Sequence, residues 1–538
     1  MCISVHQLCY VHADKEPLFQ DINLTVNKGQ RLALVGNNGT GKSTLLRIIE
    51  GSLQPSSGEI ICSSRPYYIP QHFGQFDRLT VAEALGVDDR IKAFHAILEG
   101  DTSVENFISL NDDWNVEERC LSALAFWDLG HLQLSRPMHS LSGGEKTKVF
   151  LSGILVHAPE IILMDEPTNH LDVASREKLY EIVKNGRSTM LIVSHDRMLL
   201  NLLPCICELE RNVITLYGGN FDFYKEQKEL ALTALQNRLG EKKKELRQAC
   251  KLAREVMERK NKMNARSEKY AFKKGISRMA VNTLKDKAEK STVRLGDTHE
   301  EKMVSLQDSI TDLQNAMPGL RGLQTDFNSS NLHIGKILIV AEQINFGYTS
   351  SSLWQFPMDI QVRSGDRIHI SGNNGSGKTT LVKLLLGELE PTAGTIMRTG
   401  FSYLYIDQEC SVIDPRLTVF EQTERFNTGN WAEHELKSIL NRYLFPYDTW
   451  DKGCACLSGG EKIRLLFCCL MIGNNAPDVF ILDEPTNNLD IQSVEIITAA
   501  IKSYRGTVLL ISHDHYFVKE IKINRSIKLF DTGSVIKI

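Results

Sequence analysis

A glycine-rich loop of the form GxxxxGK[ST] occurs twice in this chain, at residues 36–43 and 372–379. Each copy follows a short apolar run typical of a buried strand and precedes a segment with helical periodicity. In this strand–loop–helix context the glycines let backbone N–H groups surround phosphates at a helix N-terminus. The chain is therefore expected to contain two α/β domains that bind ATP.

Three further motifs repeat in the same order after each loop. Leu-Ser-Gly-Gly-Glu occupies 141–145 and 457–461, Asp-Glu occupies 165–166 and 483–484, and a histidine follows in a Ser-His-Asp context. The signature serines lie 316 residues apart and the aspartates 318, but the loops lie 336 apart. The first half thus contains about 20 extra residues, which we place within about 81–119 as a small helical arm.

The phosphate loops and signatures supply most candidate ATP contacts. The lysines are expected to contact the outer phosphates. The first half contributes Gly36, Asn37, Asn38, Gly39, Thr40, Gly41, Lys42, Ser43, Thr44, Ser142, Gly143 and Gly144. The second contributes Gly372, Asn373, Asn374, Gly375, Ser376, Gly377, Lys378, Thr379, Thr380, Ser458, Gly459 and Gly460.

Each site is also expected to hold Mg²⁺. The loop hydroxyls of Ser43 and Thr379 are suited to bind it, and Asp165 and Asp483, which end apolar runs, complete its oxygen shell. A glutamine follows a Tyr-rich strand in each half. Gln71 and Gln408 are therefore candidates to sense Mg²⁺ and the attacking water.

The candidate catalytic residues are two glutamates and two histidines. Glu166 and Glu484 directly follow the Mg²⁺ aspartates, where they could accept a proton from water attacking the γ-phosphate. A lone Asp-Glu pair is usually a solvated strand end, but here each pair is followed by Pro-Thr-Asn and Leu-Asp. His195 and His513 lie beyond the next strand, within reach of the γ-phosphate.

The segment between the two halves is strongly basic. Residues 238–294 contain 19 Lys/Arg and 7 Asp/Glu, whereas the rest of the chain has 43 and 59, so the net charge of -4 hides this asymmetry. Apolar residues recur at coiled-coil spacing before about 258 and again at 306–317. We predict an antiparallel helical hairpin over 222–330 with its tip at about 260–278.

The expected tip combines cations with Tyr270 and Phe272, a composition that favours nucleic-acid contact. The alternative is an ordinary solvated helix face, with the two aromatic residues packed on one another. The candidate RNA contacts are Lys260, Lys262, Arg266, Lys269, Lys273, Lys274 and Arg278.

Composition argues against export and membrane insertion. No apolar run approaches 18 residues, the first residues lack a signal-peptide pattern, and the twelve cysteines show no CxxC spacing. A cytoplasmic protein with reduced thiols and no stable membrane association is expected.

Taken together, the signatures at 142–144 and 458–460 resemble the ATP-binding-cassette superfamily. Within it, Asp-Glu-Pro-Thr-Asn-His-Leu-Asp at 165–172 and Asp-Glu-Pro-Thr-Asn-Asn-Leu-Asp at 483–490 resemble the ABC-F family, as do the tandem layout and charged linker. This resemblance implies cassettes at 1–221 and 331–538 that pair within one monomer. Each phosphate loop would then face the other half's signature, forming two hydrolytic Mg·ATP sites.

The resemblance also implies a partner. Similar proteins bind the ribosome in the closed ATP state, extend the linker towards peptidyl-tRNA and ribosomal RNA near the peptidyl-transferase centre, and leave after hydrolysis. They serve as translation factors or protect the ribosome from antibiotics. The short arm and long linker lean towards protection. The alternatives are the ATPase subunit of a membrane importer and a DNA-associated ATPase.

One residue is the candidate to stack on adenine in the second half, and two residues are candidates in the first half. In this superfamily an aromatic residue stacks on adenine, and Tyr348 lies 24 residues before Gly372. The equivalent spacing in the first half falls on His12, with Tyr10 two residues earlier. Both remain candidates there, and Tyr10 could equally be a core residue.

Overall fold

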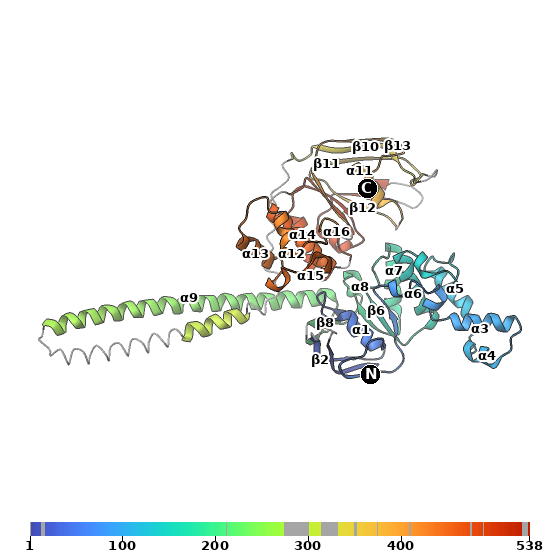
Figure 1. The fold of residues 1–538 in the computed structure, drawn as a ribbon, viewed down its shortest axis with the longest axis horizontal. Coiled ribbons are helices and arrows are strands. Elements are labelled where there is room, and N and C mark those ends of the chain that lie inside the picture. Colours follow the sequence, from blue (N-terminus) through green and yellow to red (C-terminus); the bar gives the residue numbers. More distant parts are fainter. Residues whose placement is uncertain are drawn as a thin grey trace. The chain divides into compact units, whose positions relative to one another are not determined.

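The computed structural model describes residues 2–11, 17–210, 212–273, 301–313, 332–348, 352–373, 375–407, 410–473, 476–487, 489–529 and 536–537. Two compact units are present. One contains Met1–Phe223 together with Gly322–Ile538, and the other is Tyr224–Arg321. The first unit contains both expected ATP-binding halves (Figure 1).

The first half is built on a six-stranded sheet in the order β5-β6-β7-β3-β8-β9, parallel except for the β8–β9 pair. Its strands are β3 (Arg31–Val35), β5 (Tyr67–Ile69), β6 (Ile161–Asp165), β7 (Thr189–Val193), β8 (Ile206–Glu210) and β9 (Val213–Tyr217). Every residue of β6 and β7 is buried. This burial explains why both strands are apolar throughout, because a parallel sheet that is covered on both faces has no side exposed to water.

A smaller antiparallel sheet, β2-β1-β4, completes the core of this half. It contains β1 (Ile3–Val11), β2 (Pro17–Val26) and β4 (Ser57–Cys62). Helix α1 (Lys42–Glu50) contributes four buried apolar residues to the same cluster as both sheets. This shared core fixes the position of the phosphate loop, which joins β3 to α1.

The second half repeats the plan. Its six-stranded sheet has the order β14-β15-β16-β12-β17-β18, beside the antiparallel sheet β11-β10-β13. The strands are β10 (Ile337–Asn345), β11 (Met358–Arg363), β12 (Arg367–Ser371), β13 (Ala393–Arg398), β14 (Tyr403–Ile406), β15 (Val479–Asp483), β16 (Thr507–Ile511), β17 (Arg525–Lys528) and β18 (Ile536–Lys537). Helix α11 (Lys378–Leu386) occupies the place of α1.

Helices account for the remainder of each half. In the first they are α2 (Val81–Ala84), α3 (Asp88–Leu98), α4 (Val104–Leu110), α5 (Val116–Phe126), α6 (Gly143–His157), α7 (Val173–Asn185) and α8 (Arg197–Asn201). In the second they are α12 (Val419–Arg425), α13 (Glu433–Arg442), α14 (Gly459–Gly473), α15 (Ile491–Ser503) and α16 (His515–Glu520). Short 3₁₀ turns are η1 (Gly74–Phe76), η2 (Met138–Ser140), η3 (Tyr447–Thr449) and η4 (Cys454–Cys456).

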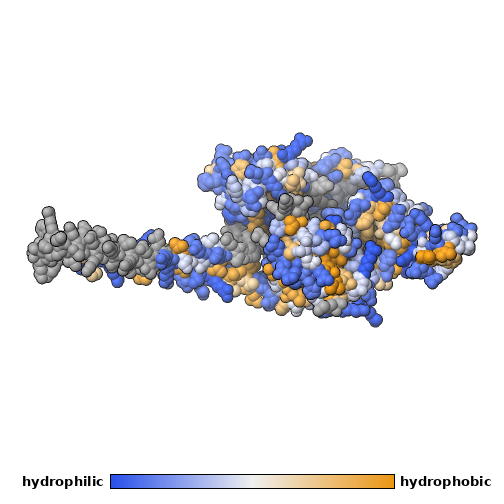
Figure 2. All heavy atoms as spheres, turned by 60° about the horizontal axis from the view of Figure 1, so that its bottom comes forward, coloured by the Kyte–Doolittle hydropathy of each residue, from blue (hydrophilic) through white to orange (hydrophobic). Residues whose placement is uncertain are grey.

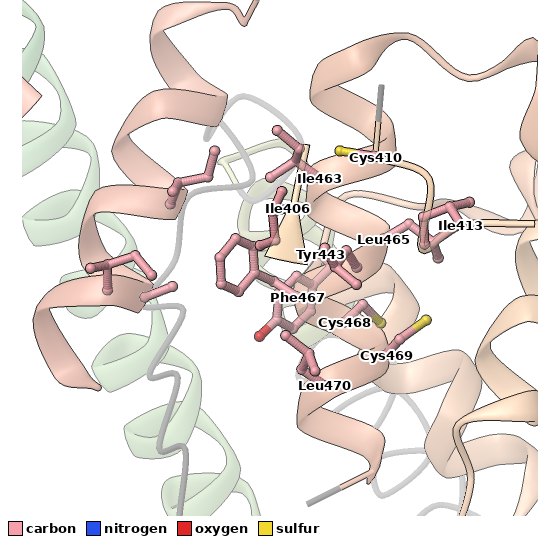
Figure 3. Packing of buried hydrophobic residues seen from close by; sticks show 14 of the residues in the cluster. Ile406, Cys410, Ile413, Tyr443, Ile463, Leu465, Phe467, Cys468, Cys469 and Leu470 are labelled. Carbon is pink, nitrogen blue, oxygen red and sulfur yellow. The ribbon is translucent and has the colours of Figure 1, made fainter. Parts of the chain in front are cut away.

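Helix α14 is held by a large apolar core. Figure 3 shows Leu465, Phe467, Cys468 and Cys469 of this helix within that cluster, with Tyr443 beside them. Cys468 and Cys469 are fully buried and unpaired, and burial raises the pKa of both thiols. They therefore act as small apolar residues, consistent with the expected set of reduced thiols.

The first half contains the helices α3 and α4 between α2 and α5, and we assign the predicted arm to these two helices. Several apolar side chains of this arm are exposed, including Leu98 at 66%, Val104 at 71% and Ile108 at 71%. Figure 2 shows hydrophobic side chains gathered at the end where Figure 1 places α3 and α4.

The second unit contains two helical segments, α9 (Phe221–Lys273) and residues 301–313. They pack antiparallel, because Leu239 shares an apolar cluster with Ile310, and the Cys250 Sγ lies 3.4 Å from the Met303 Sδ. The expected fold class, two α/β cassettes with an antiparallel helical linker, is thus confirmed. Helix α9 stays helical over 260–273, although the apolar pattern breaks at 261. The rest of the expected tip, 274–278, lies outside the described residues.

Among the helices that the structure describes, none combines the length and apolar character that crossing a bilayer requires.

The packing of Leu239 against Ile310 indicates which positions of the second unit are sensitive to mutation. Leu239→Ala removes a side chain that is 3% exposed and should destabilise the pairing of the two helices by about 2 kcal/mol or more. Leu252→Ala, on the same helix but 55% exposed, should change stability by less than about 0.5 kcal/mol. Hydrogen exchange over α9 and 301–313 measures both effects. Equal protection in the two variants would contradict the packing.

Candidate functional site

Two cavities lie where the phosphate loops meet residues from the opposite half. The first, about 580 Å³, is lined by Leu18, Asn38, Gly39, Gly41, Lys42, Ser43, Thr44, Gln71, His72, Asp165, Glu166, Val193, His195, Asp407, Ser458, Gly459, Ile463, Glu484, Pro485, Asn487 and Leu489. The second, about 530 Å³, is lined by Ser142, Gly143, Gly144, His170, Leu171, Arg176, Tyr348, Leu353, Gly375, Gly377, Lys378, Thr379, Thr380, Asp483, Glu484, Asn487 and His513. Each cavity therefore combines the loop of one half with the signature of the other.

The first phosphate loop is shaped by its glycines and its lysine. Gly41 caps α1 in the left-handed conformation, at φ 92°. The Lys42 ammonium donates to the carbonyls of Gly36 at 2.7 Å and Asn37 at 3.0 Å, and the Thr40 hydroxyl donates to Asn37. Burial lowers the pKa of Lys42, while the nearby Glu166 carboxylate raises it. The loop thus places a buried cation and the free N–H groups of a helix start at one cavity.

The second loop has the same geometry. Gly377 caps α11 at φ 87°, and Lys378 donates to the carbonyls of Gly372 at 2.7 Å and Asn373 at 3.1 Å. The Lys378 ammonium also lies 3.3 Å from the His513 Nε2. Of the expected contacts in this loop, Asn374 lies outside the described residues.

Each loop hydroxyl meets the aspartate that ends the neighbouring strand. The Thr379 hydroxyl donates to the Asp483 Oδ2 at 3.0 Å, and the Tyr405 hydroxyl donates to the same oxygen at 2.9 Å. In the first half a side-chain hydrogen bond from Ser43 lowers the pKa of Asp165, although burial raises it more. Among the residues that the structure describes, none donates a hydrogen bond to the buried Asp165 Oδ1. These paired oxygens are the ligand type that Mg²⁺ prefers, so the residues present fit this cation.

The glutamates next to these aspartates adopt a strained backbone. Glu166 has φ 50° and Glu484 φ 49°, a left-handed conformation that is uncommon in residues other than glycine. Each carboxylate accepts a hydrogen bond at 3.3 Å from the backbone N–H of the histidine beyond the next strand. The turn thereby directs both carboxyl groups into the cavities.

Burial sets the protonation of the glutamate and histidine pairs. It raises the pKa of Glu166 to about 8, with a further contribution from Asp165, and it raises the pKa of Glu484. It lowers the pKa of His195 and of His513 to about 3. Both imidazoles are therefore neutral near pH 7, with Nε2 3.4 Å from a glutamate Oε1. At pH 7 a carboxyl group with a pKa of about 8 is mostly protonated, so Glu166 acts as a base through its ionised fraction, which is a stronger base than an exposed carboxylate.

The signatures sit at helix starts. Ser142 caps α6: its hydroxyl accepts from the Glu145 N–H at 3.3 Å, and its own N–H donates to the Glu145 Oε2 at 2.7 Å. Ser458 and Glu461 make the same contacts at the start of α14, at 3.3 and 2.8 Å. This capping box leaves the next backbone N–H groups available to an anion.

The predicted glutamine and adenine-stacking residues lie at the cavities in some cases and away from them in others. Gln71 lines the first cavity, whereas Gln408 lies outside the described residues. Tyr348 lines the second cavity, 68% exposed, and its hydroxyl lies 2.9 Å from the Thr380 hydroxyl. Tyr10 packs against the core of the first half and does not line the cavity, and His12 lies outside the described residues.

On the linker, the described candidate side chains are Lys262 and Arg266, both exposed. Lys260, Lys269 and Lys273 belong to α9, but their side chains lie outside the described part, as do Lys274 and Arg278 entirely.

Sequence reasoning assigned no role to Asp490, yet its Oδ2 accepts from the Asn38 N–H at 3.2 Å. It also caps α15 through the Ser493 N–H at 2.8 Å. Its signal in the sequence was its place in the repeated Leu-Asp ending. Asp490 thus connects the phosphate loop of one half to the first turn of a helix in the other.

Comparison with known proteins defines the class. The sequence profile described as ABC transporter matches residues 19–169 and 356–487, which makes the chain an ATP-binding-cassette ATPase with two cassettes. The probable ATP-binding protein YbiT of Escherichia coli O157:H7 is 30% identical over 94% of this chain and 92% of that protein. The ATP-binding protein Uup of Haemophilus influenzae is 31% identical over 95% and 76%.

ABC transporter F family member 5 of Arabidopsis thaliana is 29% identical over 96% of this chain and 73% of that protein. Among solved structures, the archaeal ribosome recycling factor aABCE1, in complex with ribosomal stalk protein aP1, superposes with a TM-score of 0.57. It is 20% identical, over 97% of this chain and 87% of that one, so it supports the fold alone. The chain belongs to the ABC-F family.

The left-handed helix cap of the loop gives a prediction. A Cβ at residue 41 would lie 2.7 Å from the Leu18 Cδ2, whereas one at Gly51, which also has positive φ, would meet no atom within 4 Å. Gly41→Ala should therefore lower the free energy of unfolding by about 1–3 kcal/mol more than Gly51→Ala, and weaken ATP binding. Chemical denaturation and nucleotide titration measure both quantities. Equal stability of the two variants would show that the contact with Leu18 does not constrain the loop.

Proposed function

We propose that this ATPase closes its two cassettes on two Mg·ATP, binds the ribosome in that state, and leaves after hydrolysis. The observation that carries the closing step is the composition of the cavities. Each contains two helix starts from different halves, α1 with α14 and α11 with α6. A triphosphate that accepts hydrogen bonds from both would hold the halves together.

Within each site we assign roles by position. Lys42 and Lys378 contact the outer phosphates, and the loop N–H groups surround them. Ser43 with Asp165, and Thr379 with Asp483, hold Mg²⁺, which when bound offsets the charge that develops on the phosphate oxygens. Tyr348 is the adenine-stacking residue of the second site.

Glu166 and Glu484 serve as general bases. As water attacks the γ-phosphorus, the carboxylate accepts its proton, a new P–O bond forms, and the bond to the bridging oxygen breaks, giving ADP and inorganic phosphate. His195 and His513 are positioned to donate or accept at the γ-phosphate, and their burial keeps them neutral. Loss of the γ-phosphate removes the shared anion and lets the cassettes separate.

The linker supplies the surface for a polyanion. Most of its described basic side chains on α9 are exposed, and these are Arg238, Lys243, Lys244, Arg247, Lys251, Arg254, Arg259, Lys262 and Arg266. Cations in such density on exposed helix favour a phosphate backbone. Two structural neighbours have titles that name the ribosome: a ribosome recycling factor with a ribosomal stalk protein, and ribosome-bound archaeal Pelota and ABCE1. These titles agree with a ribosomal partner, and for this chain we propose ribosomal RNA and peptidyl-tRNA as what it contacts. We therefore propose that the protein is a cytoplasmic monomer that acts in translation or protects the ribosome from an antibiotic.

Removing both bases tests the cycle. Glu166→Gln together with Glu484→Gln should slow hydrolysis by about 100-fold or more and trap the ATP-bound state. The double variant should co-sediment with ribosomes in ATP but not in ADP. A failure to co-sediment in ATP would refute the ribosome proposal. Loss of the complex to DNase but not to RNase would favour a DNA-associated ATPase, and recovery in the membrane fraction would favour an importer subunit.

Reversing charge on the linker tests the contact surface. Lys262→Glu with Arg266→Glu should weaken ribosome binding of the trapped protein and reduce its dependence on salt, since fewer counterions are released. The matched control, Lys184→Glu with Arg187→Glu, changes two exposed cations on the first cassette by the same charge. Equal binding by the two double variants would show that this part of α9 does not touch the polyanion.

A further inference from the structure

One cation lines the second cavity and has no counterpart in the first. Arg176 lies on α7, four residues after the helix cap Asp172. The matched position in the second half, four residues after the helix cap Asp490, is Val494, which is 4% exposed and does not line the first cavity. The two sites are therefore chemically unequal although their motifs are the same.

Arg176 is held in place by a backbone carbonyl. Its Nε donates a hydrogen bond to the Leu171 carbonyl at 3.1 Å, and this contact orients the planar guanidinium group. Within the part of the chain that the structure describes, no carboxylate forms a salt bridge with it. The side chain is half-buried, and a partly desolvated cation is stabilised by an anion that accepts its hydrogen bonds.

The electrostatic effect of Arg176 shows where this charge acts. Arg176 lines the same cavity as Glu484, and it lowers the pKa of His513 and of His170. All three groups line the second cavity. The guanidinium therefore lies near the general base and the histidine that belong to the opposite half.

From this placement we infer that Arg176 binds the terminal phosphate of the nucleotide in the second site, reaching it from the opposite half. The two guanidinium amino groups not used by Leu171 match the geometry of phosphate oxygens. The arginine distinguishes a triphosphate from a diphosphate and makes the second site the tighter one. This inference rests on the proposed nucleotide sites and deepens them.

The test measures nucleotide affinity at the second site. In full-length protein carrying Lys42→Ala, to weaken the first site, calorimetric titration with Mg·AMP-PNP and with Mg·ADP reports the second. Adding Arg176→Gln should weaken AMP-PNP about tenfold and change ADP less than about twofold, as expected for one lost charge-assisted contact. Arg176→Lys, which keeps the charge, should lose less than Arg176→Gln.

The control is Lys178→Gln, which removes a cation from the same helix outside the cavity, where it pairs with Asp128 at 2.6 Å. It should leave both affinities unchanged, and thermal unfolding should show that all variants fold. Equal weakening of AMP-PNP and ADP by Arg176→Gln, or no change in either, overturns the inference. If neither nucleotide binds even before Arg176 is changed, while Lys378→Ala protein does bind, the proposed second site itself is wrong.

Discussion

Neither nucleotide cavity is complete within one half of the chain, and the rest of the molecule depends on this constraint. A phosphate loop gathers N–H groups and one lysine at the start of a helix, but the opposite wall is a second helix start that lies more than 200 residues away in sequence. Two positive helix ends facing one cavity repel each other and are stabilised by an anion between them. The duplication of the cassette is therefore a physical requirement for a clamp within one chain.

Burial then sets the pKa values of the glutamates and histidines in the two cavities. The strands that carry Asp165 and Asp483 are enclosed on both faces, so these aspartates and the glutamates that follow them are buried. Burial there raises the pKa of both glutamates and keeps both histidines neutral. The left-handed turn at each glutamate is the strained element that makes this placement possible.

The two halves share this plan but differ in residues outside the repeated motifs. The first half carries the arm α3–α4, and only the second cavity contains an arginine from α7. The linker differs from both in kind, since its stability comes from a narrow apolar seam around Leu239 and Ile310, while most of its described surface is charged and exposed. Such a helix pair can present cations without adding to the cassette core.

The sequence by itself determined the two α/β halves and the antiparallel linker, because these follow from local periodicity and from glycines that only certain turns require. It also located the loops, the carboxylates and the histidines within the chain. Only the tertiary structure decided what faces them. The contacts of Asp490 with Asn38, and of Arg176 with the second cavity, join residues from different halves, and such pairings leave no periodic trace in sequence. The tip of the linker illustrates the converse: α9 continues past the break in its apolar pattern, because good helix formers such as Lys, Arg, Ala and Glu sustain a helix without an apolar face.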